Sequence, residues 1–129
     1  MISVNRSIDI ENEVRLVLAD HFTTYCRPLP ADFSTPCLEI TATGGDTANT
    51  IDNFIVIIDA RADSDAAADE LARNAAAVLE KLASEQSGAL RFAAINALGR
   101  WGRDPARPDL CLRTITARVI AHREQITIQ

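Results

Sequence analysis

Acidic side chains gather in the segment DARADSD, residues 59–65, with a spacing that resembles part of a calcium-binding loop. Such a loop places oxygen ligands at positions 1, 3, 5, 7, 9 and 12 and a glycine at position 6. Counted from the first aspartate, Arg61 stands at position 3, Ser64 at position 6 and Ala67 at position 9. A cation therefore replaces one ligand, a second ligand is missing, and the turn lacks its glycine. The sequence predicts no metal site here.

The same segment has the features of a junction between a strand and a helix. Asp59 ends an apolar strand, whereas Asp63 and Ser64 stand immediately before an alanine-rich run. Either side chain can accept hydrogen bonds from the free N–H groups of a first helical turn. Asp65 and Asp69 would then lie near the positive end of the helix dipole. We therefore predict a helix cap in place of a metal ligand set.

A nucleophilic site would require a thiol or hydroxyl with a base within reach. His21 lies close in sequence to Cys26, and Asp20 precedes it, but adjacent helical residues point in different directions. Asp20 would therefore not orient His21. The three cysteines form no C-x-x-C pair, so zinc is not expected and the thiols should be reduced. The sequence predicts neither an enzyme nor a bound cofactor.

Arginines surround the single tryptophan in a segment that should form the tip of a hairpin. This basic cluster consists of Arg100, Trp101, Arg103 and Arg107. Arginine and tryptophan are enriched at the centres of protein interfaces, so our first interpretation is a contact with a partner protein. The second is an exposed hairpin tip without a partner. The third is nucleic-acid binding by charge and stacking, which ranks last because the chain is acidic, with a net charge of -5.

Two helices and four main strands are predicted from the spacing of apolar residues. The first helix spans Asp9 to Phe22, and the second runs from about Ser64 to Ala83, with Gly88 as a stop. The predicted buried stripe of the second helix comprises Ala68, Leu71, Ala75, Val78 and Leu82. The predicted strands cover 37–45, 53–62, 89–101 and 110–123.

Details of these strands set further expectations. The first strand should end at Gly44 and Gly45, with a turn rather than a tight hairpin before the next strand. In the third strand, alternation places Leu90 and Phe92 on one face. The last two strands should form an antiparallel hairpin around the loop 102–109.

The order of elements predicts an α+β fold: an antiparallel or mixed sheet of about four main strands, with two helices packed on one face. The length and even composition favour a single domain over residues 1–129. The longest strongly apolar run, Phe54 to Ile58, is too short to span a membrane, and the first residues lack a signal-peptide core. A cytoplasmic protein is expected.

Charge is divided unevenly along the chain. Residues up to Glu85 include 6 basic and 15 acidic side chains, a net charge of −9, whereas the remainder has 7 basic and 3 acidic, a net charge of +4. Opposite charge at two ends would suit head-to-tail association of identical copies. An uneven but solvated surface is the alternative interpretation.

Together these segments resemble the tail-terminator proteins of tailed bacteriophages and prophages. The resemblance spans nearly the whole chain. It rests on the order of EVRLVLAD, the approach LPADFSTPCLEITATGG, the strand and helix IVIIDARADSDAAADELARNAAAVLEKL, the loop DPARPDL and the strand RTITARVIAH. It implies a structural protein without catalytic residues that assembles, usually as a hexameric ring, on the last ring of the tail tube.

The resemblance also implies partners and a location. The ring would end tail polymerisation, contact the tail-tube protein and present a surface to head-completion proteins, and DNA would pass through its lumen without specific binding. Its location would be the host cytoplasm during assembly and the neck of the virion tail afterwards, with no membrane partner. Another head–tail connector or tail-assembly protein is the alternative, and a small non-viral ligand-binding α+β domain is an alternative of a different class.

Overall fold

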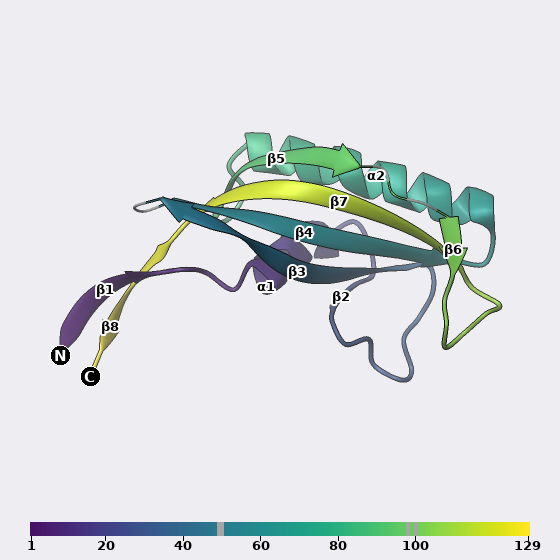
Figure 1. Ribbon diagram of the computed structural model, residues 1–129, viewed down its shortest axis with the longest axis horizontal. Helices are drawn as coiled ribbons and strands as arrows, with labels where there is room; N and C mark the ends of the chain where they lie inside the picture. Colours follow the sequence, from purple (N-terminus) through teal and green to yellow (C-terminus); the bar gives the residue numbers. More distant parts are fainter. Residues whose placement is uncertain (49–50, 98, 100) are drawn as a thin grey trace.

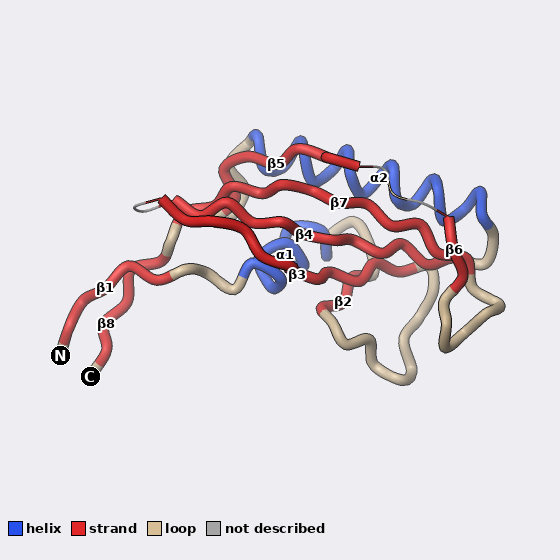
Figure 2. Tube along the Cα trace, viewed as in Figure 1, coloured by secondary structure: helices blue, strands red, loops and turns tan. Residues whose placement is uncertain are grey.

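The computed structural model describes residues 1–48, 51–97, 99 and 101–129, without the side chains of residues 48, 97 and 101. These residues form the helices and strands drawn in Figure 1 and coloured by type in Figure 2. The helices are α1 (Ile10–Ala19) and α2 (Asp65–Ser84). The strands are β1 (Ile2–Arg6), β2 (Thr24–Cys26), β3 (Cys37–Ala48), β4 (Ile51–Ala62), β5 (Leu90–Ala97), β6 (Trp101–Arg103), β7 (Cys111–His122) and β8 (Glu124–Ile128).

The main sheet has the strand order β2-β3-β4-β7-β5, and β6 also pairs with β7. β2 runs parallel to β3, and the other pairs in this sheet are antiparallel. Buried residues of both helices join one core cluster with those of the sheet, so both helices cover the same face (Figure 1). The α+β prediction is confirmed, although the sheet contains more than the four main strands expected.

The inner faces of the two central strands follow from their alternation. Val56 and Ile58 of β4 are fully buried under the helices. The inner residues of β7 are likewise buried: Ile115, Ala117, Val119 and Ala121. Apolar residues at every second position therefore predicted the core face of both strands correctly.

β3 continues beyond its double glycine, which the sequence had suggested as its end. The strand extends to Ala48 and pairs with β4, with a register shift between Ala42 and Gly44. Gly45 has φ +142, and a Cβ atom there would lie 1.9 Å from the carbonyl oxygen of Asn53. Gly45 therefore permits a close backbone approach within the hairpin. The prediction of a turn rather than a tight hairpin between these two strands was wrong, since Ala48 of β3 pairs with Ile51 of β4.

β5 presents a different face from the one that simple alternation suggests. Its pairing with β7 shifts register between Leu90 and Phe92. The irregularity keeps Leu90 in the core but turns Phe92 to the uncovered face, where its side chain is 49% exposed. The predicted common face for these two residues was therefore wrong.

The start of α2 confirms the predicted cap. Ser64 has an extended backbone, and its Oγ accepts a hydrogen bond of 3.1 Å from the N–H of Ala67. Ala68 and Ala75 of the predicted stripe are buried, but the other buried residues of the helix are Ala72, Ala76, Leu79 and Ala83. Leu71 and Val78 only pack against the edge of the core. Five of the six buried residues are alanines, whose small side chains allow the helix to pack close to the sheet.

Ser64→Ala should lower the free energy of unfolding by about 1 kcal/mol, because the Ala67 N–H loses its acceptor. Asp63→Ala is the matched control and should cost much less, since the side chain of Ser64 forms the cap. Urea unfolding of both variants measures the difference. Millimolar calcium should leave the melting temperature of the parent protein unchanged. A calcium-dependent rise of several degrees would show that the acidic segment binds metal.

The terminal strands β1 and β8 pair with each other, a feature that the sequence analysis missed. They form a separate two-stranded antiparallel sheet. Figure 1 shows that this ribbon projects away from the main sheet, and both chain ends lie at its tip. Neither strand packs extensively against another element of the described chain.

The two oppositely charged parts of the sequence do not form opposite ends of the fold. β7, from the basic part, lies between β4 and β5 in the main sheet. Several ion pairs join the two parts: Arg61–Asp104, Arg113–Asp69 and Arg123–Asp52. Arg113–Asp69 and Arg123–Asp52 neutralise part of the charge asymmetry within one copy, and the two parts share one sheet, so the expected charge separation between two ends was wrong.

Candidate interaction surface

The predicted basic cluster lies at the end of the sheet where β6 leads into the loop before β7. Arg100 lies outside the described residues, and Trp101 is described only by its backbone, which pairs with Arg113. The other two arginines of the cluster are both exposed. Arg103 donates a hydrogen bond of 3.0 Å from Nη1 to Sγ of the buried Cys111.

Arg107 is held on the surface by two neighbours. Its Nε and Nη2 donate to the two carboxylate oxygens of Asp109, at 3.2 and 3.1 Å. Its guanidinium carbon lies 5.8 Å from the ring centre of Phe33, which belongs to the loop between β2 and β3. The arginine therefore connects two loops that are far apart in sequence. The planar guanidinium of Arg107 is already held against the face of the Phe33 ring.

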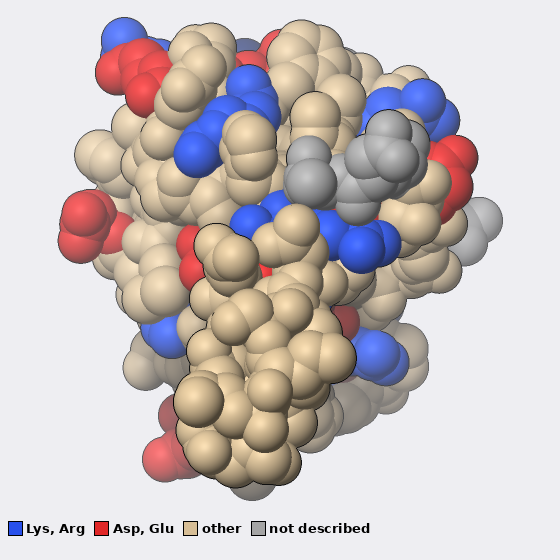
Figure 3. Space-filling view, turned by 90° about the vertical axis from the view of Figure 1, so that its left-hand side faces the viewer, with Lys and Arg blue, Asp and Glu red and all other residues tan. Residues whose placement is uncertain are grey.

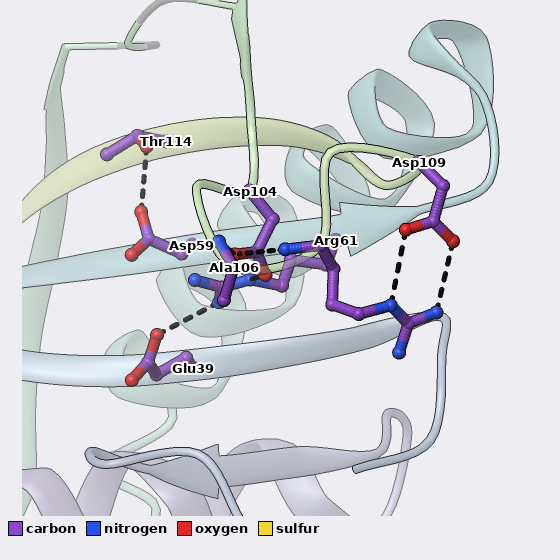
Figure 4. A network of polar contacts seen from close by, with 8 residues as sticks. Glu39, Asp59, Arg61, Asp104, Ala106, Asp109 and Thr114 are labelled. Atoms are coloured by element: carbon purple, nitrogen blue, oxygen red, sulfur yellow. Dashed lines mark hydrogen bonds and ion pairs between the residues drawn. The ribbon is translucent and has the colours of Figure 1, made fainter. Parts of the chain in front are cut away.

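The loop between β6 and β7 is anchored to the sheet by Asp104 (Figure 4). Its Oδ1 accepts from the backbone N–H groups of Ala106, at 2.9 Å, and Arg107, at 3.3 Å. Its Oδ2 accepts from Nε of Arg61 on β4, at 2.8 Å. One buried carboxylate thus both closes the turn and attaches it to the outer face of the sheet.

Arg61 is the centre of this network. Its Nη1 donates to Oε1 of Glu39 on β3 at 2.9 Å. The side chains of Arg61 and Asp104 are only 9% and 6% exposed, so water screens their charges weakly. The three side chains come from β4, β3 and the loop after β6, and join these elements at one end of the sheet.

The two ionic groups at the core of the network keep their charges at neutral pH. Burial alone would raise the pKa of Asp104, but the N–H of Ala106 and the guanidinium of Arg61 outweigh it and lower that pKa. Burial alone would likewise lower the pKa of Arg61, but hydrogen bonds to Asp104 and Glu39 raise it above its usual value. These groups supply fixed charges and are unsuited to exchanging protons near neutral pH.

A recess of about 400 Å³ lies beside this network, between the two loops. Its lining residues are Leu29, Pro30, Ala31, Phe33, Glu39, Arg61, Asp104, Ala106 and Arg107. Cys37 is near these charges but is buried, and burial raises the pKa of its thiol to about 11. The thiol is therefore protonated at neutral pH and is a poor nucleophile. Among the described residues, no group of three or more His, Cys, Asp or Glu could hold a metal ion.

The sequence located the basic cluster but missed the ionic network behind it. Arg61 alternates with apolar residues on β4, which predicts only that it lies on the outer face of the strand. Its partner Asp104 is 43 positions away, in a loop whose path the sequence does not reveal. The one available signal was the placement of Glu39 and Arg61 on polar faces of two strands expected to pair.

No family model matches the chain, and no curated protein matches it in sequence. No helix among the residues that the structure describes is both long and apolar enough to cross a membrane. The case for a function therefore rests on the surfaces of this chain and on the order of its elements.

Proposed function

We propose that this chain is a structural subunit of a tailed bacteriophage or prophage that caps the tail tube as a ring of identical copies. The ring would stop tube growth and offer its other surface to head-completion proteins. We further propose a ring of six copies, with DNA passing through the lumen without specific binding. The acidic character of the chain, with a net charge of -5, suits a channel in which phosphates must not be held.

The observation that carries the proposal is the uncovered outer face of the main sheet. Both helices lie on the other face, so no helix covers the outer face within the described chain, and the loop after β6 packs over its end at Arg61. Its side chains include the exposed Phe92 and the half-buried Ile55, Ile57 and Ile120. A two-layer fold with apolar side chains on its open face is suited to association with further copies.

The anchored loop at the end of the sheet gives the proposal a second contact surface. Arg103 and Arg107 are exposed there, and the Asp104–Arg61 ion pair fixes the loop that follows β6. A loop that is already ordered loses little conformational entropy when it binds. We assign this end of the sheet to the contact with the tail-tube protein or with an adjacent copy, and Trp101 and Arg100 of the same cluster are part of that proposal.

The proposal predicts a direct effect on tube growth. A purified tail-tube protein from the same phage or prophage should polymerise into tubes of variable length, and adding the chain should stop elongation and shorten them. Arg103→Glu should raise the concentration needed for half-maximal effect about tenfold, as expected for loss of an interface arginine. Electron microscopy of tube lengths measures both effects.

Arg73→Glu is the matched control, because Arg73 is exposed on α2 and, among the described residues, pairs with Asp69 of the same helix in an i,i+4 pair. It should cap tubes as the parent protein does. Tubes that grow to the same length with and without the parent chain would contradict the proposal. Binding to a head-completion protein without any effect on tube length would instead favour a connector.

A further inference from the structure

The ribbon of β1 and β8, called the terminal ribbon below, has one apolar and one polar face. Ile2 lies opposite Ile128, and Val4 lies opposite Ile126. The polar positions between them are Ser3, Asn5, Gln125 and Thr127. Since side chains alternate between the two faces of a strand, all four aliphatic residues share one side of the ribbon.

The apolar face of the terminal ribbon is not covered by its own chain. Ile2 is 59% exposed and Ile128 is 50% exposed. A two-stranded sheet alone is marginally stable in water, and it becomes stable when its apolar face packs on another element. The body supplies no such element, because neither strand packs extensively against the rest of the described chain. The ribbon therefore calls for a surface from another molecule.

The charges of the terminal ribbon limit which kinds of surface it can bind. The charged side chains of the terminal ribbon are Arg6 and Glu124, at its base, and they neutralise each other, with Arg6 Nε 2.7 Å from Glu124 Oε1. Figure 3 looks onto this end of the molecule and shows mostly uncharged atoms in the lower foreground, where the ribbon lies. Neither a nucleic acid nor an ionic surface would find complementary charge on it. The apolar face of the ribbon therefore requires apolar side chains from its partner.

The outer face of the main sheet provides apolar side chains on every copy, beside the exposed Arg118. Phe92 lies opposite Ile120 in the β5–β7 pair, and Ile55 lies on the same face of β4. A recess of about 190 Å³ adjoins this patch and is lined by Gly45, Asp46, Asn53, Ile55 and Arg118.

We infer that the terminal ribbon of one copy packs its apolar face on the outer sheet face of the next copy. Both surfaces expose apolar side chains, and they are located on different parts of the chain. Their contact is therefore head-to-tail, which produces a closed ring when the rotation between copies closes. Packing of one sheet on another would cover the outer face that the helices leave open. This inference deepens the proposed function and rests on its self-assembly.

Mixing two variants provides the test. The ribbon variant, Ile2→Asp with Ile128→Asp, retains an intact outer face, and the face variant, Phe92→Asp, retains an intact ribbon. Each alone should be monomeric, with self-association weakened at least tenfold relative to the parent chain. An equimolar mixture should form a one-to-one heterodimer and nothing larger, because only one functional contact remains. Native mass spectrometry of the full chain distinguishes these species.

Two control variants introduce the same aspartate substitutions on surfaces outside the proposed contact. Ser3→Asp with Thr127→Asp also places two carboxylates at directly opposed positions, but on the polar side of the ribbon. Leu16→Asp adds a charge at a side chain on α1 that is 50% exposed, close to the 49% of Phe92. Both controls should assemble like the parent chain. All variants should retain the parent unfolding midpoint in urea, which separates loss of assembly from loss of fold.

Three results would overturn the inference: a ribbon variant that assembles like the parent chain, a mixture that stays monomeric, or a parent chain that is monomeric at every concentration tested. The proposed function fails separately. If the parent chain and the ribbon variant both cap tail tubes, the proposed capping function is supported and the proposed ribbon contact is contradicted. If the heterodimer forms but tubes grow without limit, the proposed ribbon contact is supported and the proposed capping function is contradicted.

Discussion

Arg61→Met should lower the free energy of unfolding by about 3 to 5 kcal/mol, the usual cost of removing one partner from a buried ion pair. The substitution retains the aliphatic stem but removes the cation that both Asp104 and Glu39 contact. Asp104 would then be a buried carboxylate with only backbone N–H partners. The loop that presents Arg103 and Arg107 should lose its attachment to the sheet. Urea denaturation at neutral pH measures the loss.

The effect of Arg61→Met should depend on pH in a defined direction. The pKa of Asp104 is lowered in the folded parent protein, so its contribution to stability is present above the pKa of the unfolded chain. That contribution is lost as the pH falls through the folded-state pKa. In the variant, burial would act on Asp104 without the opposing guanidinium, so protonation would relieve it. The difference between parent and variant should therefore shrink below about pH 4.

Arg73→Met is the control for the loss of an arginine from an ion pair. Its partner Asp69 is on the same helix, and the Arg73 side chain is 62% exposed. Such a pair contributes about 0.3 to 0.5 kcal/mol, so the control should be nearly neutral. A cost below about 1 kcal/mol for Arg61→Met would contradict the role given to the buried network.

Leu79→Ala should be the second most damaging substitution, with a cost of about 2 to 5 kcal/mol. Leu79 of α2 is fully buried in the core cluster that joins both helices to the sheet. Truncation removes apolar contacts and leaves a cavity among neighbours that cannot fully collapse. Thermal or urea unfolding gives the loss directly.

Leu82→Ala tests which face of α2 packs on the sheet. The sequence analysis placed Leu82 in the buried stripe, but the structure leaves it only partly buried. Its truncation should cost about 1 kcal/mol, well below the cost for Leu79. Equal costs at the two positions, or a larger cost at Leu82, would show that the helix is rotated from the orientation described above.

Local patterns predicted the elements whose neighbours lie close in sequence. The cap at Ser64 depends on a hydrogen bond between residues only three positions apart, so both partners can be recognised in one short stretch of sequence. The buried faces of β4 and β7 follow from strict alternation. The stripe of α2 was predicted only in part, because the pattern gives most weight to large side chains, whereas packing close to a sheet favours Ala72 and Ala76.

Features that depend on distant partners could not be predicted in the same way. The terminal ribbon joins Ile2 to Ile128, and its two short alternating segments show no nearby turn. The register shift that exposes Phe92 breaks the alternation from which faces are inferred. The candidate interaction surface was located by its arginines, but its anchor at Asp104 depends on a partner 43 positions away.

Electron microscopy of the tube ends tests the central claim most directly. Tail tubes should be assembled with the parent chain, and averaged images should be computed separately for the two ends. The account predicts a ring of six copies of this chain at one end of each tube, with the terminal ribbon of each copy on the outer sheet face of its neighbour. Tubes whose two ends are identical, with no added density from this chain, would contradict it.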